Sequence, residues 1–291
     1  MSFFKNATVT SILISQLFGY GSAVSPDVAQ AHMPQLSKSE AEARLQELKD
    51  ALRKDFDADT LHSIFNVKEF GFEMKMFDPK KINPEKAVAQ GKKDYEWYRG
   101  LLRLDEKIMD APAILAHYFD ELRIVEIKYG IDKRIAVGFY GLESDFGRNK
   151  GDYIAPNALA TLYVFGDKES RKYALAEFKP LIRYAKLRGI SVYSLTSSRM
   201  AAIGCGQFIP SSLISLFIGK NGHVKTANPF DPVDCFHSIG NFLTNRWDRT
   251  KNGLTPIEGS KNWNAIGSYN NNSEPFIKAV IELSTSLPYR H

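Results

Sequence analysis

Helical signals dominate this chain of 291 residues and restrict the folds that are open to it. Ser37 and Glu40 form a capping-box pattern before a helix that should run to about Arg53. Apolar residues within it recur at helical spacing: Ala41, Leu45, Leu48 and Leu52. The sequence has no long run in which apolar and polar residues alternate as in a half-buried strand. It therefore predicts a mainly α-helical protein.

Caps, glycines and prolines place the other expected helices. Helical patterning covers residues 113–129, after which Gly130 marks a helix end and Asp132 caps the next helix. Residues 56–77 show little periodicity, and residues 189–195 suit a short strand or an extended turn. Later helices are expected over residues 157–163, 170–187, from 210, 231–242 and 274–284.

The chain divides, on these signals, into a leader and two folded parts. Residues 1–31 resemble an export signal, with Lys5 as an early charge, an apolar stretch over 7–20 and small residues at the expected cleavage site. The apolar stretch is too short to span a bilayer, so we expect a periplasmic or secreted protein without a stable membrane anchor. We expect residues 32–109 to form a helical region that packs on a core of residues 110–291.

Composition narrows the possible partners. Lysine and arginine exceed aspartate and glutamate, which gives a net charge of +5 and favours anionic partners. The basic residues are scattered among acids, and export argues against nucleic acid as the partner, so we expect that the protein does not bind nucleic acid. We also expect a monomer. Cys205 and Cys235 are too few for a disulfide scaffold; one bridge or two buried thiols would both fit.

One glutamate carries the functional hypothesis. Glu143 occurs in the stretch Gly-Leu-Glu-Ser-Asp-Phe-Gly, at the end of an apolar helix and before a glycine-punctuated loop. Burial beside Tyr140 and Phe146 would favour its protonated form near neutral pH. A neutral carboxyl group that faces small residues, amides and hydroxyl groups suits acid chemistry on a sugar.

Four further segments follow this stretch in a characteristic order. They are Ala-Leu-Ala-Thr-Leu at 158–162, Gly-Cys-Gly-Gln-Phe-Ile-Pro-Ser-Ser at 204–212, Phe-Asp-Pro-Val-Asp at 230–234, and Tyr269-Asn270. Together the five motifs resemble those of the type B lytic murein transglycosylases, over about residues 110–285. The resemblance implies a lysozyme-like core and cleavage of the β-1,4 bond between N-acetylmuramic acid and N-acetylglucosamine in peptidoglycan.

The resemblance also implies roles for individual residues and requires no cofactor. Glu143 would act as the single acid and base, and the substrate's acetamido oxygen as internal nucleophile, to give a 1,6-anhydro product. Ser198 matches a serine that hydrogen-bonds the catalytic glutamate, and Gln207 matches a residue that contacts substrate. Tyr269 and Asn270 match residues that hold sugar near the cleaved bond. From the sequence alone, however, Ser198 could equally cap a turn.

Two nearby aspartates leave a second outcome open. A second carboxylate could make the protein a lysozyme-type hydrolase. Asp145 lies two residues after Glu143, and such positions point to different faces of a helix. Asp152, in the following loop, could fold back toward the site more easily. Either aspartate could instead contact a cationic amino sugar in de-N-acetylated peptidoglycan.

Two departures from the family pattern concern the binding of calcium and of peptide stems. Residues 217–223 lack the carboxylates that calcium requires, so we expect no bound metal. The basic patch after the 158–162 motif is thinner than in the family, with Arg171 and Lys172, which argues against binding of peptide stems there. A wall-binding protein that retains the fold without catalysis is the other alternative, although the intact Glu143 and its accompanying motifs argue against it.

Overall fold

The computed structural model describes residues 36–77, 88–249 and 257–288, and the expected export signal, residues 1–31, lies outside these ranges. The described chain is mainly helical, as predicted, and contains a two-stranded antiparallel sheet. Within those ranges no helix combines the length and the apolar character needed to cross a lipid bilayer.

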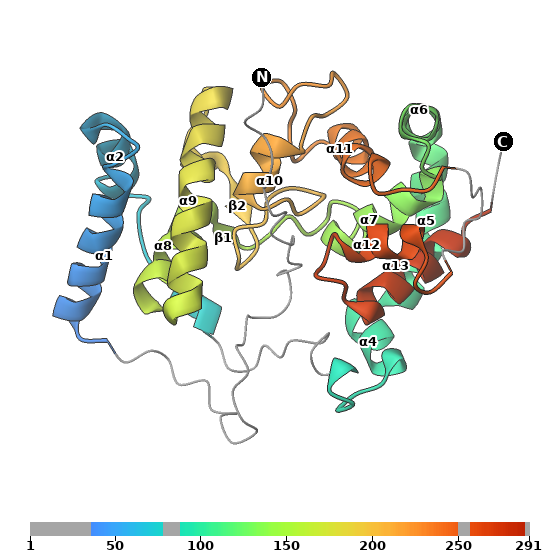
Figure 1. The fold of residues 1–291 in the computed structure, drawn as a ribbon, viewed down its shortest axis with the longest axis horizontal. Helices are drawn as coiled ribbons and strands as arrows, with labels where there is room; N and C mark the ends of the chain where they lie inside the picture. Colours follow the sequence, from blue (N-terminus) through green and yellow to red (C-terminus); the bar gives the residue numbers. More distant parts are fainter. Residues whose placement is uncertain (1–35, 78–87, 250–256, 289–291) are drawn as a thin grey trace.

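Short helices joined by capped turns make up most of the chain (Figure 1). In order they are α1 (Lys38–Leu52), α2 (Ala58–Phe65), the 3-10 helix η1 (Met74–Phe77), α4 (Tyr95–Leu102), α5 (Leu104–His117), α6 (Phe119–Tyr129), α7 (Lys133–Ser144), α8 (Ala155–Phe165), α9 (Lys168–Arg188), the 3-10 helix η2 (Val192–Ser194), α10 (Pro210–Ser215), α11 (Pro232–Thr244), α12 (Lys261–Gly267) and α13 (Glu274–Thr285). The strands β1 (Tyr153–Ile154) and β2 (Thr196–Ser197) pair with Tyr153 opposite Ser197.

The helix ends that the sequence predicted are confirmed. The Ser37 hydroxyl accepts a hydrogen bond from the Glu40 amide at 3.3 Å, and the Glu40 carboxylate accepts one from the Ser37 amide at 2.8 Å, which completes the capping box. Gly130 ends α6 in the left-handed conformation, with φ 67°, and Asp132 caps α7. Asp231 caps α11 through the Asp234 amide.

Tertiary packing overrides the sequence pattern elsewhere. The prediction of a single helix over 113–129 was wrong, because α5 ends and α6 begins on either side of Tyr118. The Tyr118 ring packs edge-on against Phe236 of α11, with ring centroids 5.3 Å apart. The stretch 56–77, which shows little periodicity, holds α2 and η1, and Phe65 of α2 packs against Phe178 of α9 with ring centroids 5.8 Å apart. The sequence did not predict α12. A helix this short is stabilised mainly by the packing of its buried residues against the rest of the protein.

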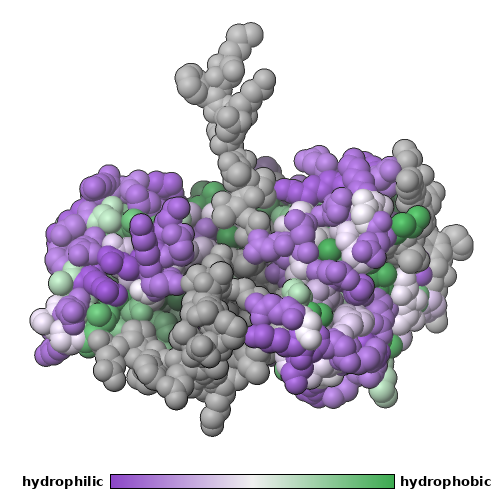
Figure 2. Space-filling model, turned by 60° about the horizontal axis from the view of Figure 1, so that its bottom comes forward, coloured by the Kyte–Doolittle hydropathy of each residue, from purple (hydrophilic) through white to green (hydrophobic). Residues whose placement is uncertain are grey.

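The helices fall into two groups with the small sheet between them (Figure 1). On one side α1 and α2 lie with α8 and α9; on the other α7 lies with α11 and α13, surrounded by α4, α5, α6 and α12. The sheet and α10 occupy the middle. The face seen in Figure 2 is largely hydrophilic, with apolar side chains in small separate areas. The expected boundary at residue 110 falls inside α5, and the division into two parts stays a prediction.

Candidate active site

Glu143 lies on α7, a helix that the rest of the protein almost entirely encloses. Asp132 starts the helix by accepting a hydrogen bond from the Arg134 amide at 2.9 Å. The helix packs closely on α13, and a Cβ atom at Gly138 would collide with the Ser284 hydroxyl. Glu143, the penultimate residue of α7, is 0% exposed. Burial favours the neutral form of a carboxyl group, which is the form that can donate a proton.

The chain turns sharply at the end of α7. Asp145 and Phe146 both adopt the left-handed conformation, with φ 51° and 55°. The Ser144 hydroxyl donates to the Tyr140 carbonyl at 3.2 Å and accepts from the Gly147 amide at 3.1 Å. Left-handed backbone costs energy at non-glycine residues, so contacts around this turn must hold it in place.

Asp145 makes the strongest of those contacts. Its carboxylate forms ion pairs with the buried Lys107 of α5 at 2.9 Å and with Arg148 at 2.9 Å. Burial alone would raise the pKa of Asp145, but hydrogen bonds from Arg148 and Lys107 outweigh this and lower the pKa to about 2. Asp145 is therefore a charged group bound to two cations, and it braces the end of α7.

Asp152 lies in the loop before β1. Its side chain is exposed, and its backbone carbonyl accepts a hydrogen bond from the Lys75 ammonium group of η1 at 2.8 Å. A contact between Asp152 and substrate stays a prediction.

The segment 198–208 forms two tight turns beside the small sheet. Ile203 bridges to Ser197 on one side and to Phe208 on the other. The Ser198 hydroxyl accepts from the Ala202 amide at 3.1 Å, and so caps the first turn. The turn-capping interpretation of Ser198 is thus confirmed, while its bond to the glutamate stays a prediction.

Gln207 occupies the second turn and is 1% exposed. Its backbone is left-handed, with φ 47°, and its side-chain amide donates to the Gly204 carbonyl at 2.7 Å. Its buried Oε1 has no hydrogen-bond partner among the described residues. Buried polar atoms are usually hydrogen-bonded, so this oxygen is available to a donor on a bound group.

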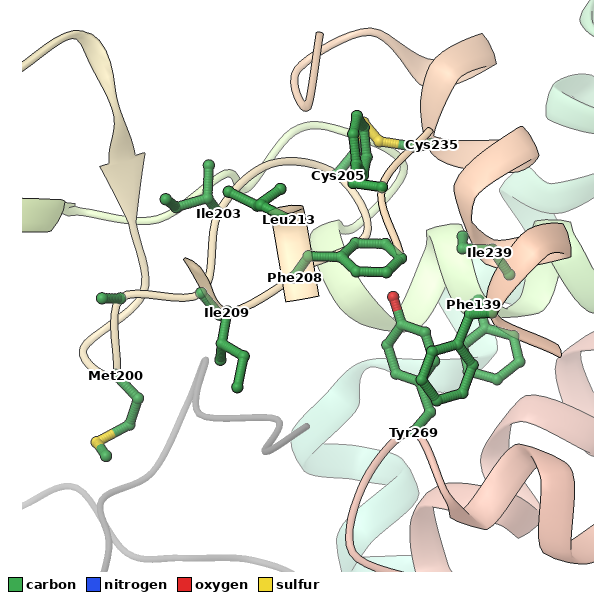
Figure 3. Close-up of a cluster of buried hydrophobic side chains, with 14 of the residues drawn as sticks. Phe139, Met200, Ile203, Cys205, Phe208, Ile209, Leu213, Cys235, Ile239 and Tyr269 are labelled. Carbon is green, nitrogen blue, oxygen red and sulfur yellow. A yellow bond between two sulfur atoms is a disulfide. The ribbon is translucent and has the colours of Figure 1, made fainter. Parts of the chain in front are cut away.

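Aromatic rings enclose Tyr269, which is 0% exposed. Its ring centroid lies 4.7 Å from those of both Phe139 and Phe242, and 5.6 Å from that of Phe208. Figure 3 shows the hydroxyl directed toward the loop that carries Phe208, where it donates to the Gly206 carbonyl. Tyr269 therefore joins the C-terminal motif to the glutamine motif.

Tyr269 also interacts electrostatically with Glu143. Burial raises the pKa of Tyr269 well above its usual value, and the neighbouring Glu143 carboxylate raises the pKa further. The phenol consequently stays protonated and can only donate its single proton to one partner at a time. Asn270, the next residue, is 4% exposed. The structure thus brings Glu143, Tyr269 and the Gln207 loop together.

A disulfide joins Cys205 to Cys235 of α11, with their Cα atoms 6.2 Å apart. Of the two arrangements that the sequence left open, the structure has the bridge. The Cys205 amide also donates to the Pro229 carbonyl at 2.8 Å. Both contacts fix the Gln207 loop to the start of α11.

Asp234 organises the loop over residues 217–228, which includes the segment 217–223 where we expected no calcium. Its carboxylate accepts hydrogen bonds from the Lys220 amide at 2.8 Å and the Asn228 amide at 2.7 Å. The Lys220 ammonium group pairs with Glu121 at 2.8 Å. The two amide donors on Asp234 and the lysine on Glu121 do not resemble the oxygen ligands of calcium. The absence of calcium stays a prediction.

Sequence reasoning missed several residues that shape this site. Arg148 lies three residues after Asp145, a spacing that could have revealed the pair. Lys107 gave no such signal, because it lies on another helix. The rings around Tyr269 come from α7, the 198–208 loop and α11, and only the fold brings them together.

The family described as "Transglycosylase SLT domain" matches residues 40–276, most of the chain. The chain belongs to the transglycosylase SLT domain family. Membrane-bound lytic murein transglycosylase B of Escherichia coli (strain K12) is 29% identical over 148 residues, which are 50% of this chain and 40% of that relative. The match thus spans less than half the length of that protein.

Solved structures show that this transglycosylase SLT domain protein shares its fold with lytic transglycosylases. Soluble lytic transglycosylase SltB1 from Pseudomonas aeruginosa superposes with a TM-score of 0.69 at 21% identity, covering 84% of this chain and 97% of that one. Escherichia coli lytic transglycosylase Slt35, in complex with calcium, gives 0.66 at 21% identity over 85% and 92%. SltB3 from Pseudomonas aeruginosa gives 0.67 at 19% identity over 86% and 80%. The predicted lysozyme-like helical fold is confirmed.

Proposed function

We propose that this protein is an exported lytic transglycosylase that cleaves the β-1,4 bond between N-acetylmuramic acid and N-acetylglucosamine in peptidoglycan. The family match and the names of its relatives support this function. SltB3, of the same fold, was solved with NAG-NAM-pentapeptide and with NAG-anhNAM-pentapeptide. The observation that carries the proposal is the complete burial of Glu143 beside Tyr269 and the Gln207 loop.

Glu143 is the acid and the base of the proposed reaction. Its protonated carboxyl donates a proton to the glycosidic oxygen as the bond to the muramoyl anomeric carbon breaks. The substrate's acetamido oxygen attacks that carbon and holds the positive charge that develops. The Glu143 carboxylate then takes the proton of the muramoyl 6-hydroxyl, whose oxygen displaces the acetamido group and closes the 1,6-anhydro ring. Glu143 is thereby protonated again.

Other residues of the site orient the sugar in this proposal. Gln207 has a buried acceptor oxygen that suits a hydroxyl or amide N–H group of the glycan. Ser198 supports Glu143, and Asn270 binds sugar near the cleaved bond. Glu143 and Tyr269 have no exposed surface, so the atoms that cover them must move when a glycan enters. Asp152, which is exposed, would meet the substrate farther out.

A lysozyme-type hydrolysis is less well supported. It would need a second carboxylate near the cleaved bond to activate water or attack the sugar. Asp145 is the nearest in sequence, but Lys107 and Arg148 both bind it. The structure therefore favours the mechanism with one carboxyl group.

The proposed location is the periplasm or the exterior. The Cys205–Cys235 bridge suits an oxidising compartment, where disulfides form and persist. The export signal expected at residues 1–31 agrees with this location.

Product analysis tests the proposed function. The mature protein is incubated with purified sacculi, native and chemically de-N-acetylated, and the products are identified by mass spectrometry. We expect 1,6-anhydromuramoyl ends on native sacculi. Reducing ends would establish hydrolysis instead, and binding to sacculi without any cleavage would establish a non-catalytic wall-binding protein.

A further inference from the structure

Arg199 has an unusual environment within the proposed active site. It follows Ser198 directly and belongs to the turn that the Ser198 hydroxyl caps. Its side chain is half-buried, and its guanidinium carbon lies 5.9 Å from the centre of the Phe77 ring of η1. Its buried Nε has no hydrogen-bond partner among the described residues. Burial lowers the pKa of Arg199, in agreement with its partly enclosed position.

No carboxylate of the described chain forms an ion pair with Arg199. Two other arginines with buried or half-buried side chains do find one: Arg99 pairs with Glu282 at 2.8 Å, and Arg134 with Asp132 at 3.1 Å. A partly desolvated guanidinium without a counter-charge is unfavourable for the folded protein. Residues kept at such a cost are common where a ligand supplies the missing charge.

The surroundings of Arg199 combine cations with aromatic rings. Tyr153 of β1 lies opposite Ser197 in the sheet and interacts electrostatically with Arg199. The ammonium group of Lys75 lies 4.7 Å from the centre of the Tyr153 ring. Rings offer flat apolar faces to a sugar, while a guanidinium offers paired N–H donors to a carboxylate. A glycan that carries carboxylates presents both features.

We propose that Arg199 binds a carboxylate of the peptidoglycan substrate and so determines specificity for anionic strands. The inference rests on the proposed function, because it assumes that glycan strands enter beside Ser198. Peptidoglycan offers this carboxylate from two sources, the stem peptide or the lactyl group of a muramic acid that has lost its peptide. A planar guanidinium can form two parallel hydrogen bonds with either.

Calorimetric binding tests the inference apart from catalysis. The binding protein is Glu143→Gln, and the ligands are glycan fragments in three forms: with native stem peptides, with the stem carboxyls amidated, and with the peptides removed by an amidase. We expect the native fragments to bind about tenfold more tightly than the amidated ones, as one charge-assisted hydrogen-bonded pair would give. Adding Arg199→Gln should bring this ratio close to one.

The control is Arg246→Gln. Arg246 is also half-buried and has no acidic partner among the described residues, but it lies just after the end of α11 and donates to the Phe242 carbonyl at 2.6 Å. This variant should keep the wild-type ratio. Arg199→Lys should keep part of it, because lysine retains the charge and loses the paired donors. Should Arg199→Gln fail to fold, the lysine variant still reports the effect.

The three forms of the glycan fragments distinguish the source of the carboxylate. A loss of affinity in Arg199→Gln that is confined to fragments with native peptides assigns the stem peptide. A similar loss with peptide-free fragments assigns the lactyl group. The inference is overturned if Arg199→Gln leaves the affinities for native and for peptide-free fragments both unchanged, or if Arg246→Gln lowers them equally. Cleavage of sacculi by the unaltered protein is measured separately, so failure of the proposed function is recognised independently.

Discussion

The phenol of Tyr269 and the carboxyl of Glu143 interact within the buried core, although their positions are 126 apart in a chain of 291 residues. The Tyr269 hydroxyl is committed to the Gly206 carbonyl, beside Gln207. One side chain therefore connects the end of α7 with the loop that carries the proposed substrate contacts. A substitution at Tyr269 should therefore affect both the end of α7 and the Gln207 loop.

Replacement of Tyr269 by Phe removes this connection. The Gly206 carbonyl loses its donor, and we expect a loss of about 1–2 kcal/mol in the free energy of unfolding and about tenfold in turnover of sacculi. Tyr184→Phe is the matched control, because Tyr184 is equally buried and its hydroxyl has no hydrogen-bond partner among the described residues. Equal stability and turnover in Tyr269→Phe and Tyr184→Phe would contradict a bridging role for Tyr269.

The Asp145 ion pairs should make stability depend on acid pH. The pKa of Asp145 in the folded protein, about 2, lies below its ordinary value of 3.8. The ion pairs therefore stabilise the protein fully above about pH 4, and this contribution is lost as the pH falls toward 2. Asp145→Asn should lower the unfolding free energy by about 2 kcal/mol at pH 7 and lose that part of the acid dependence.

Urea unfolding at several pH values between about 2 and 7 measures this effect, and Asp152→Asn, at an exposed position, serves as the control. The control should retain the unaltered protein's acid dependence. If Asp145→Asn showed the same loss of stability on acidification as the unaltered protein, the ion pairs with Lys107 and Arg148 would not contribute to it.

The disulfide should stabilise the site loop. Cys205 and Cys235 are 30 residues apart, and closing a loop of that length is worth about 3–4 kcal/mol in the chain-entropy description. The double variant Cys205→Ser/Cys235→Ser should lose about that much in the free energy of unfolding by urea. Addition of a reductant should destabilise the unaltered protein and leave the double variant unchanged. Equal sensitivity of both proteins to reductant would contradict the expectation.

Calcium should have no effect on this protein. Asp234 already accepts the Lys220 and Asn228 amides that shape the 217–228 loop. We therefore expect the same melting temperature in excess EDTA and in millimolar calcium. A calcium-dependent rise would show that the loop binds the ion, and Asp234→Asn should then abolish the rise.

The local parts of this structure could be predicted from sequence because their causes are local. The Ser37–Glu40 capping box, the left-handed Gly130 and the Asp132 cap each depend on residues within one turn of helix. The break at Tyr118 was not predicted, because the sequence around it continues the helical pattern and the Phe236 ring that Tyr118 contacts lies far along the chain. Periodicity alone continues a helix through such a position.

In the candidate site, too, some features could be predicted from the sequence and others could not. The glutamate motif was visible because its residue types and order are distinctive, and the burial expected for Glu143 is found. The partners of Asp145 were not visible, because Lys107 reaches it from another helix. The sequence also left the state of Cys205 and Cys235 open, since only the fold brings their Cα atoms to 6.2 Å.

The most direct test of the account compares Glu143→Gln with Glu177→Gln on purified sacculi. Both glutamates are buried, at 0% and 5% exposure, but Glu177 only accepts hydrogen bonds from Ser211 at the start of α10. We predict that Glu143→Gln folds normally and releases 1,6-anhydro products at least about a hundredfold more slowly, as loss of a general acid and base requires. Glu177→Gln should retain activity. Release of these products by Glu143→Gln at the rate of the unaltered protein would contradict the account.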